Sequence, residues 1–174
     1  MAYSNITKTT MAETMKTLMS EKPFAKISVG DICERCGMNR KTFYYHFKDK
    51  YDLVNWIFQT EFVEMMRVQN YNSGWELLSD ICRYFYSERT FYTNALQVEG
   101  ENSFRDYFAA CIGSFLPEIM RDQFSSMEDP RYFVEFFTDA IQAAILRWLK
   151  STPVLPPDEF MSRLTSVMDI LKKT

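Results

Sequence analysis

Apolar residues recur every three or four positions along most of this chain, which is the spacing of one face of an α-helix. The strict alternation of apolar and polar residues that marks a half-buried strand does not stand out in any segment. Helices are predicted over residues 6–18, a short segment after residue 28, and residues 40–47, 51–68, 75–86, 90–98, 103–124, 131–150 and 159–172. The pattern predicts an all-α fold of about nine helices.

The best-marked helix ends lie between residues 28 and 40. Ser28 and Asp31 have the spacing of a capping box, and Gly37 is expected to end the helix that they open, because glycine readily takes the left-handed conformation. Asn39 is expected to cap the next helix. Two short helices around a glycine turn, with another helix packed on them, match a helix-turn-helix unit.

Three further residues are expected to mark helix ends in the rest of the chain. Asp49 is expected to cap the helix at residue 51, and Asp158 the helix at residue 159. Pro117 predicts a kink or a break, because proline has no N–H to donate within a helix.

Residues 38–47, MNRKTFYYHF, combine five rings with two strong bases. At roughly 100° per residue, Phe43 and Phe47 share one side of the helix and are expected to be buried. Lys41, Thr42 and Tyr45 are expected to face outward and Tyr44 and His46 to flank that face, while Arg40 lies at the start of the helix close to Asn39. Such groups bond guanine edges, pack on thymine methyls and donate to phosphates, so the segment predicts a recognition helix in the DNA major groove. An ordinary solvated helix face is the alternative.

Charge is divided unevenly along the chain. Residues 1–50 hold nine Lys or Arg against five Asp or Glu, a net charge of +4, while residues 51–174 hold eleven against eighteen, a net charge of −7. The total of −3 therefore hides a basic head and an acidic body. Only the head is expected to meet phosphate.

Residues 27–56, ISVGDICERCGMNRKTFYYHFKDKYDLVNW, resemble the DNA-binding segment of TetR/AcrR (tetracycline-repressor) transcriptional regulators. In that family a capped second helix, a turn glycine, a T-F-Y-x-H-F recognition helix and a K-D-K cap follow in this order. The segments YDLVNWIFQTEF and GWELL are similar to the branch that contains the dihydroxyacetone-kinase operon activator. The resemblance implies a sequence-specific regulator that binds a palindromic operator as a dimer under the control of an effector.

The resemblance implies a helix-turn-helix DNA-binding domain in residues 1–50 and a helical effector-binding and dimerisation domain in residues 51–174. The residues and the resemblance together give these candidates for DNA contact: Ser28, Asn39, Arg40, Lys41, Thr42, Tyr44, Tyr45, His46, Lys48 and Lys50. Double-stranded DNA is the expected partner.

A wide apolar band on residues 131–150, continued on the last helix, predicts that these helices of two chains form a four-helix bundle. The candidate homodimer contacts are Phe133, Phe137, Ala140, Ile141, Ala144, Trp148, Leu164 and Met168. The alternative is that this band packs inside one subunit.

Aromatic residues are frequent between residues 75 and 115, the region that encloses an effector pocket in the resembling family. The effector candidates are Trp75, Tyr84, Phe85, Arg105, Tyr107 and Phe108, with simple core packing as the alternative. The alternative function is that of an activator subunit or a helical adaptor. In that case the C-terminal domain would dock a partner protein rather than a small molecule.

Other chemistry is not expected. Cys33 and Cys36 have the spacing of half a metal or redox site, but a zinc ion would need two more ligands and His46, the only histidine, is assigned to DNA. No metal or cofactor is expected, and oxidation coupled to DNA release stays open as an alternative for the two thiols. Without a phosphate loop or a nucleophile elbow, an enzyme is not expected. Since the chain has no long apolar run and no signal-like start, it is expected in the cytoplasm, away from membranes.

Overall fold

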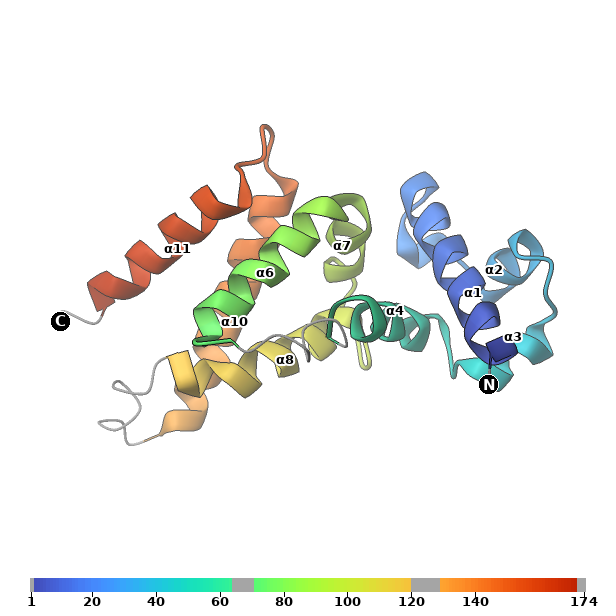
Figure 1. Ribbon diagram of the computed structural model, residues 1–174, viewed down its shortest axis with the longest axis horizontal. Coiled ribbons are helices and arrows are strands. Elements are labelled where there is room, and N and C mark those ends of the chain that lie inside the picture. The colour runs from blue at the N-terminus through green and yellow to red at the C-terminus, as the bar shows by residue number, and fades with distance from the viewer. Residues whose placement is uncertain (1, 64–70, 120–128, 172–174) are drawn as a thin grey trace. The chain divides into compact units, whose positions relative to one another are not determined.

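The computed structural model describes residues 2–63, 71–119 and 129–171 (Figure 1), which form nine α-helices, a 3-10 turn (η1), a π-helix (η2) and no strand. The elements are α1 (Ala2–Glu21), η1 (Phe24–Lys26), α2 (Val29–Arg35), α3 (Arg40–His46), α4 (Lys50–Phe58), η2 (Gln59–Val63), α6 (Gly74–Ser87), α7 (Arg89–Leu96), α8 (Phe104–Ile119), α10 (Pro130–Lys150) and α11 (Pro157–Leu171). The predicted all-α fold is confirmed.

The chain divides into two compact units. The first is built from the elements α1 to η2 together with α7 and residues 97–107, and the second from α6, the later part of α8, α10 and α11. This division by packing differs from the functional division at residue 50, which stays a prediction.

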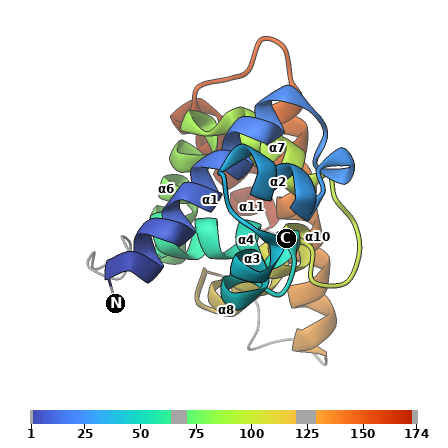
Figure 2. The same ribbon diagram turned by 90° about the vertical axis from the view of Figure 1, so that its right-hand side faces the viewer.

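In the first unit, α1 contacts both α2 and α4, and α2 contacts α3. Figure 2 shows α2 and α3 beside α1. Four side chains from these helices, Met11, Met15, Ile32 and Phe43, are fully buried. Apolar burial of this kind is the main favourable term in folding, so the short helices α2 and α3 depend on the core that they share with α1.

A second cluster in the same unit is aromatic. Phe58 at the end of α4 stacks on Phe62 in η2, with ring centroids 5.3 Å apart, and also contacts Tyr92 of α7 and Phe104 of α8. The predicted continuous helix over residues 51–68 therefore widens into a π-helix at Gln59, and residues 64–68 lie outside the described part.

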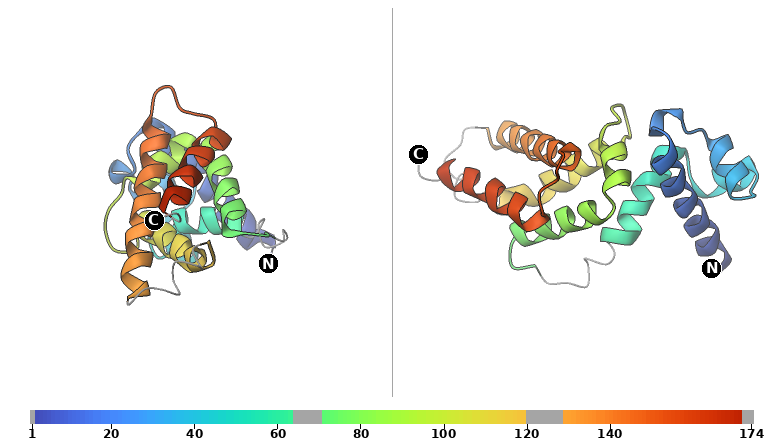
Figure 3. Two further views of the ribbon diagram at one scale, coloured as in Figure 1. Left: turned by 90° about the vertical axis from the view of Figure 1, so that its left-hand side faces the viewer. Right: turned by 90° about the horizontal axis from the view of Figure 1, so that it is seen from above.

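In the second unit, α6 contacts both α10 and α11, which the right-hand view of Figure 3 shows beside it. Trp148 of α10 stacks on Phe160 of α11 with centroids 4.4 Å apart, and its indole N–H donates to the Leu155 carbonyl at 2.9 Å. Arg89 donates to the carbonyls of Leu149 and Ser151, which closes the C-terminal end of α10.

Two predicted helix ends differ in the structure. Helix α11 begins at Pro157, where a proline has no N–H to leave unsatisfied, so the predicted cap Asp158 is wrong. Asp158 lies in the first turn and accepts hydrogen bonds from the guanidinium of Arg83. Pro117 does not end α8, which continues to Ile119; the predicted extension to residue 124 lies outside the described residues.

Candidate nucleic-acid interface

The helix starts in the head are held by side-chain caps. Ser28 and Asp31 form the predicted capping box: the Ser28 N–H donates to the Asp31 carboxylate at 2.7 Å, and the Asp31 N–H donates to Ser28 Oγ at 3.1 Å. Hydrogen bonds from Ser28 and Lys22 lower the pKa of Asp31 to about 2, so the box is ionised at neutral pH. Asn39 Oδ1 accepts from the Thr42 N–H at 2.8 Å, which fixes the first turn of α3.

The turn between α2 and α3 uses a left-handed glycine. Gly37 has φ of 66°, a conformation that costs a side chain about 1–2 kcal/mol, and the Met38 N–H donates to the Cys33 carbonyl at 2.9 Å. The predicted glycine turn is confirmed. It sets the direction in which α3 leaves α2.

Helix α3 has one buried side and one exposed side, as its sequence pattern predicts. Phe43 is fully buried and Phe47 nearly so. On the other side Tyr45 is 82% exposed, and Lys41 is exposed beside it. A helix face that presents a largely exposed tyrosine ring beside a lysine is unusual for a surface that meets only water, because exposing the apolar ring gives no favourable free energy.

Ring contacts restrict the exposed tyrosines. Tyr44, 57% exposed, lies edge-on against Phe43 with centroids 5.5 Å apart. Tyr45 makes a similar edge-on contact with the half-buried His46 at 4.9 Å. Each tyrosine hydroxyl is therefore carried on a ring that is supported at its base, so less conformational entropy is lost when it binds.

Lys50 occupies a structural position in the free chain. Its ammonium donates to the carbonyls of Phe24, Ala25 and Ile27 at 2.9, 3.4 and 2.7 Å, and lies 4.4 Å from the centre of the Phe24 ring. An ammonium has three donors, so all are engaged, and burial lowers the pKa of Lys50. Contact with a phosphate would require the release of one of these bonds.

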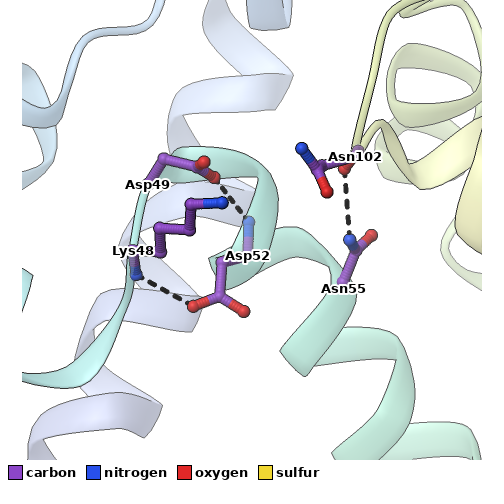
Figure 4. A pocket seen from close by; sticks show the side chains of 5 residues that line it. All are labelled: Lys48, Asp49, Asp52, Asn55 and Asn102. Atoms are coloured by element: carbon purple, nitrogen blue, oxygen red, sulfur yellow. Dashed lines mark hydrogen bonds between the residues drawn. The ribbon is translucent and has the colours of Figure 1, made fainter.

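A small cavity of about 160 Å³ opens at the start of α4, lined by Lys48, Asp49, Asp52, Asn55 and Asn102 (Figure 4). Asp49 caps α4 as predicted, accepting from two backbone N–H groups, and Asp52 accepts from the Lys48 N–H. Asn55 donates to the Asn102 carbonyl at 3.3 Å. Because two carboxylates face this cavity and occupy N–H groups at the helix start, it does not suit phosphate.

One basic residue near α3 was not predicted from the sequence. Lys8 of α1 places its ammonium 5.6 Å from the centre of the Phe47 ring and 5.4 Å from that of Trp56. Its position follows from the packing of α1 against α4, and no motif around residue 8 signals it.

The cysteines are free thiols. Burial raises the pKa of Cys33, and the Cys36 thiol lies 3.7 Å from the Cys33 carbonyl. Cys33 lies within α2 and Cys36 at its C-terminal cap, and the raised pKa of Cys33 lowers its fraction of reactive thiolate. Among the described residues, no group of three or more histidine, cysteine or acidic side chains is placed to hold a metal ion.

The eight predicted dimer contacts are divided by the structure. Phe137, Ile141 and Trp148 are buried within the second unit instead, which is the alternative considered above, so they offer little new surface to a partner. Ala140 is exposed, and Phe133, Ala144 and Leu164 are half-buried. The side chain of Met168 lies outside the described part. Among the described side chains of these two helices, the large apolar ones that are exposed are Tyr132 (70%), Phe136 (57%) and Val167 (55%).

The six predicted effector residues do not all belong to one unit. Arg105 and Tyr107 lie in the first unit, where Arg105 pairs with Glu99 and Tyr107 contacts Phe58. In the second unit, Phe85 and Phe108 are fully buried against each other at 5.0 Å, which is core packing. Trp75 and Tyr84 are half-buried there.

A buried hydroxyl on α10 is a further polar feature of the second unit. Thr138 is 6% exposed, and its Oγ1 has no hydrogen-bond partner among the described residues. A buried polar atom without a hydrogen-bond partner is rare in folded proteins.

The helices that the structure describes include none that is long and apolar enough to cross a membrane.

Comparison with known proteins matches the two parts of the chain separately. Residues 14–57 match the family model of bacterial regulatory proteins, tetR family, and residues 75–169, more than half of the chain, match a transcriptional regulator C-terminal region. A curated relative, the HTH-type dhaKLM operon transcriptional activator DhaS of Lactococcus lactis subsp. lactis (strain IL1403), is 30% identical over 125 residues. That match covers 71% of this chain, and the chain spans 65% of the length of that relative.

Solved structures show the same fold. The dihydroxyacetone kinase operon activator DhaS superposes with a TM-score of 0.67 at 22% identity, covering 97% of each chain. NalD, the secondary repressor of the MexAB-OprM multidrug efflux pump in Pseudomonas aeruginosa, superposes with a TM-score of 0.64 at 20% identity, covering 95% of this chain and 96% of that one. Both matching models describe regulators rather than enzymes, so the expectation of a non-enzymatic regulator is confirmed. The chain belongs to the TetR family of bacterial transcriptional regulators.

Proposed function

We propose that this chain regulates transcription by binding a palindromic operator as a homodimer, with α3 of each subunit in a major groove. The observation that carries the proposal is the arrangement of α3, in which Tyr45 and Lys41 are exposed opposite the fully buried Phe43. A major groove admits one helix, and base edges are reached from its outward side.

The side chains of α3 suit different parts of the duplex. Arg40 and Lys41 would bond the O6 and N7 atoms of guanine, and the exposed ring of Tyr45 would pack on a thymine methyl. Tyr44 and His46, at the edges of the exposed face, would donate to phosphate oxygens. Lys8, Lys48 and the exposed caps Ser28 and Asn39 lie at the periphery, where they would add phosphate contacts and position the helix rather than read bases.

Binding to DNA is tested with the purified chain and a pool of random-sequence duplex oligonucleotides at low ionic strength. We expect the chain to retain DNA, and we expect rounds of selection to enrich a palindromic sequence. For the enriched duplex, log K should fall linearly with log salt concentration, by about 0.9 for each phosphate neutralised. A helical adaptor that docks only proteins would retain no duplex at any salt concentration, and that outcome would exclude the proposal.

The proposed dimer surface is the outer side of α10 and α11. Tyr132, Phe136 and Ala140 follow one another at intervals of four residues on α10, and all are exposed. On α11, Val167 is exposed and Leu164 half-buried, so both helices present apolar side chains to solvent. Exposed apolar groups aligned on neighbouring helices are typical of an interface between subunits.

Changing Phe136 to glutamate is expected to convert the dimer into a monomer at micromolar concentration. A charge placed in the centre of an apolar interface loses its hydration without gaining a partner, whereas in the monomer position 136 is open to water. Light scattering measures the mass of both proteins directly. Phe136→Tyr, which keeps the ring, serves as the control and should stay dimeric; a Phe136→Glu protein that remains dimeric would place the interface elsewhere.

Control by an effector is proposed for the second unit. The half-buried Trp75 and Tyr84 and the unpartnered hydroxyl of Thr138 are the groups of this unit that a small molecule could engage without displacing fully buried rings. An effector that weakens DNA binding must itself bind less tightly when DNA is present, because coupling between two sites is reciprocal. Titration of a candidate compound with and without the selected duplex measures both effects.

A further inference from the structure

Gly30, in the first turn of α2, leaves a space that the side chain of Arg40 fills. A Cβ atom built on Gly30 would lie 2.9 Å from Arg40 Nη2 and 3.8 Å from its Cζ. Real Cβ atoms essentially never approach a neighbour as closely as 2.9 Å. The guanidinium from the start of α3 therefore rests directly on the backbone of α2, at a place that only glycine leaves open.

The backbone at Gly30 does not itself require glycine. Only Gly37 and Gly100 have a positive φ among the glycines in the described part of the chain, so Gly30 has a conformation that any residue adopts. A glycine within a helix costs about 0.5–1 kcal/mol relative to alanine, because it loses more conformational freedom on folding. Glycine thus lowers the stability of helix α2 at a position where its missing side chain leaves room for Arg40.

Arg40 differs in its bonding from most of the other arginines that the structure describes. Arg35 pairs with Glu21, Arg83 with Asp158, and Arg89 donates to backbone carbonyls. The side chain of Arg40 makes no hydrogen bond or ion pair with residues 2–63, 71–119 and 129–171, and it is exposed. Its direction is therefore set by packing on α2 while its five N–H donors remain available.

We propose that Gly30 is a positioning residue that aims the guanidinium of Arg40 at a base edge, so that α2 as well as α3 determines which base pair is preferred. The inference rests on the proposed function. The ligand group is the O6 and N7 pair of guanine, which a guanidinium bonds through two parallel N–H groups. Two parallel bonds demand a fixed orientation, and the space over Gly30 supplies it.

The test compares the wild-type chain with Gly30→Ala, Arg40→Ala and the double variant. In Gly30→Ala the nearest atom, Arg40 Nη2, ends a flexible side chain that moves aside, and the next, Ser28 Oγ at 3.3 Å, has to shift by a few tenths of an ångström. The gain from replacing a helical glycine offsets that shift, so the fold remains and the melting temperature should stay close to that of wild type. Each protein selects from a pool of random-sequence duplexes. We expect wild type to prefer guanine at one position of each half-site, and both single variants to lose that preference.

Affinity for the duplex that wild type selects gives the second measurement. Loss of an oriented guanine contact in both half-sites should weaken binding roughly 30-fold to 10⁴-fold in Gly30→Ala and Arg40→Ala alike. The double variant should bind no more weakly than Arg40→Ala, since both changes remove the same contact. Gly113→Ala is the matched control: it is also a helical glycine, its nearest neighbours would be 3.7 Å away, and selection should not change.

Three results would overturn the inference. They are identical base preference and affinity in Gly30→Ala and wild type, losses that add in the double variant, or a Gly30→Ala chain whose circular dichroism shows that it no longer folds. If wild type itself enriches no duplex, the proposed function fails and this inference with it. Failure in the variants alone leaves the proposed function standing.

Discussion

Replacing Tyr45 by alanine is expected to weaken binding to the selected duplex by about 2–6 kcal/mol, roughly 30-fold to 10⁴-fold in Kd, because each of two half-sites loses a contact worth about 1–3 kcal/mol. Tyr45 is 82% exposed and its ring lies nearly perpendicular to that of His46, so most of its area is free for the groove. Fluorescence anisotropy on a labelled duplex measures the change.

Two comparisons show that this loss comes from recognition and not from unfolding. Unfolding in urea should give the same stability for Tyr45→Ala and wild type to within about 0.5 kcal/mol, because an exposed side chain contributes little. Tyr45→Phe keeps the ring and should retain most of the affinity if the ring packs on a thymine methyl. An unchanged Kd in Tyr45→Ala would show that α3 does not lie in the major groove, and the proposed function would then be wrong.

Replacing Phe43 by alanine is expected to lower the free energy of unfolding by about 3–5 kcal/mol, because it removes a fully buried ring and leaves a cavity. Phe43 contacts the rings of Phe47 and Tyr44, so the cavity would loosen α3 along its whole length. Typical domains are stable by only about 5–15 kcal/mol, so this change endangers folding at physiological temperature. Urea denaturation followed by circular dichroism gives the shift in midpoint.

Phe43→Leu is the matched control for the core. It keeps an apolar side chain that partly fills the site and should cost less than the alanine change. Since Phe43 and Tyr45 are rings on the same short helix, their alanine variants form a pair with opposite expectations: large loss of stability for one and large loss of affinity for the other. A Phe43→Ala protein of wild-type stability would show that α3 is not anchored through its buried side.

The caps and the turn of the head were predictable because they depend on neighbours in the sequence. The capping box of Ser28 and Asp31 and the cap at Asn39 join residues three positions apart, and Gly37 is the residue type that a left-handed turn favours. The two sides of α3 followed from a spacing of four residues between Phe43 and Phe47. Each of these features has a local cause.

Features that depend on distant residues were missed. Lys50 was predicted to contact DNA, but in the free chain its ammonium donates to carbonyls more than 20 residues earlier in the sequence. Lys8 reaches Phe47 and Trp56 only because α1 packs on α4. The residues next to either lysine do not show which distant groups its ammonium meets.

The apolar residues of α10 show that an apolar pattern also does not reveal which distant groups a side chain contacts. The sequence identifies the apolar positions of this helix but not which neighbour covers each of them, since a helix that is apolar over a wide arc can face its own core and a partner at once. The structure buries Ile141 and Trp148 within the second unit and leaves Phe136 open. The proposed dimer surface therefore lies on the side of α10 that carries Phe136 rather than on the side that carries Ile141 and Trp148.

The sequence alone determined that the chain is helical, where the head helices begin and turn, and which side of α3 is anchored, because helix periodicity, capping and glycine geometry act over a few residues. Only the tertiary structure decided that Lys50 closes a backbone turn, that Arg40 rests on Gly30, and that Tyr132 and Phe136 are exposed on α10 while Phe137 is buried. These depend on which helices meet, and contacts between helices are set by the packing of the whole unit.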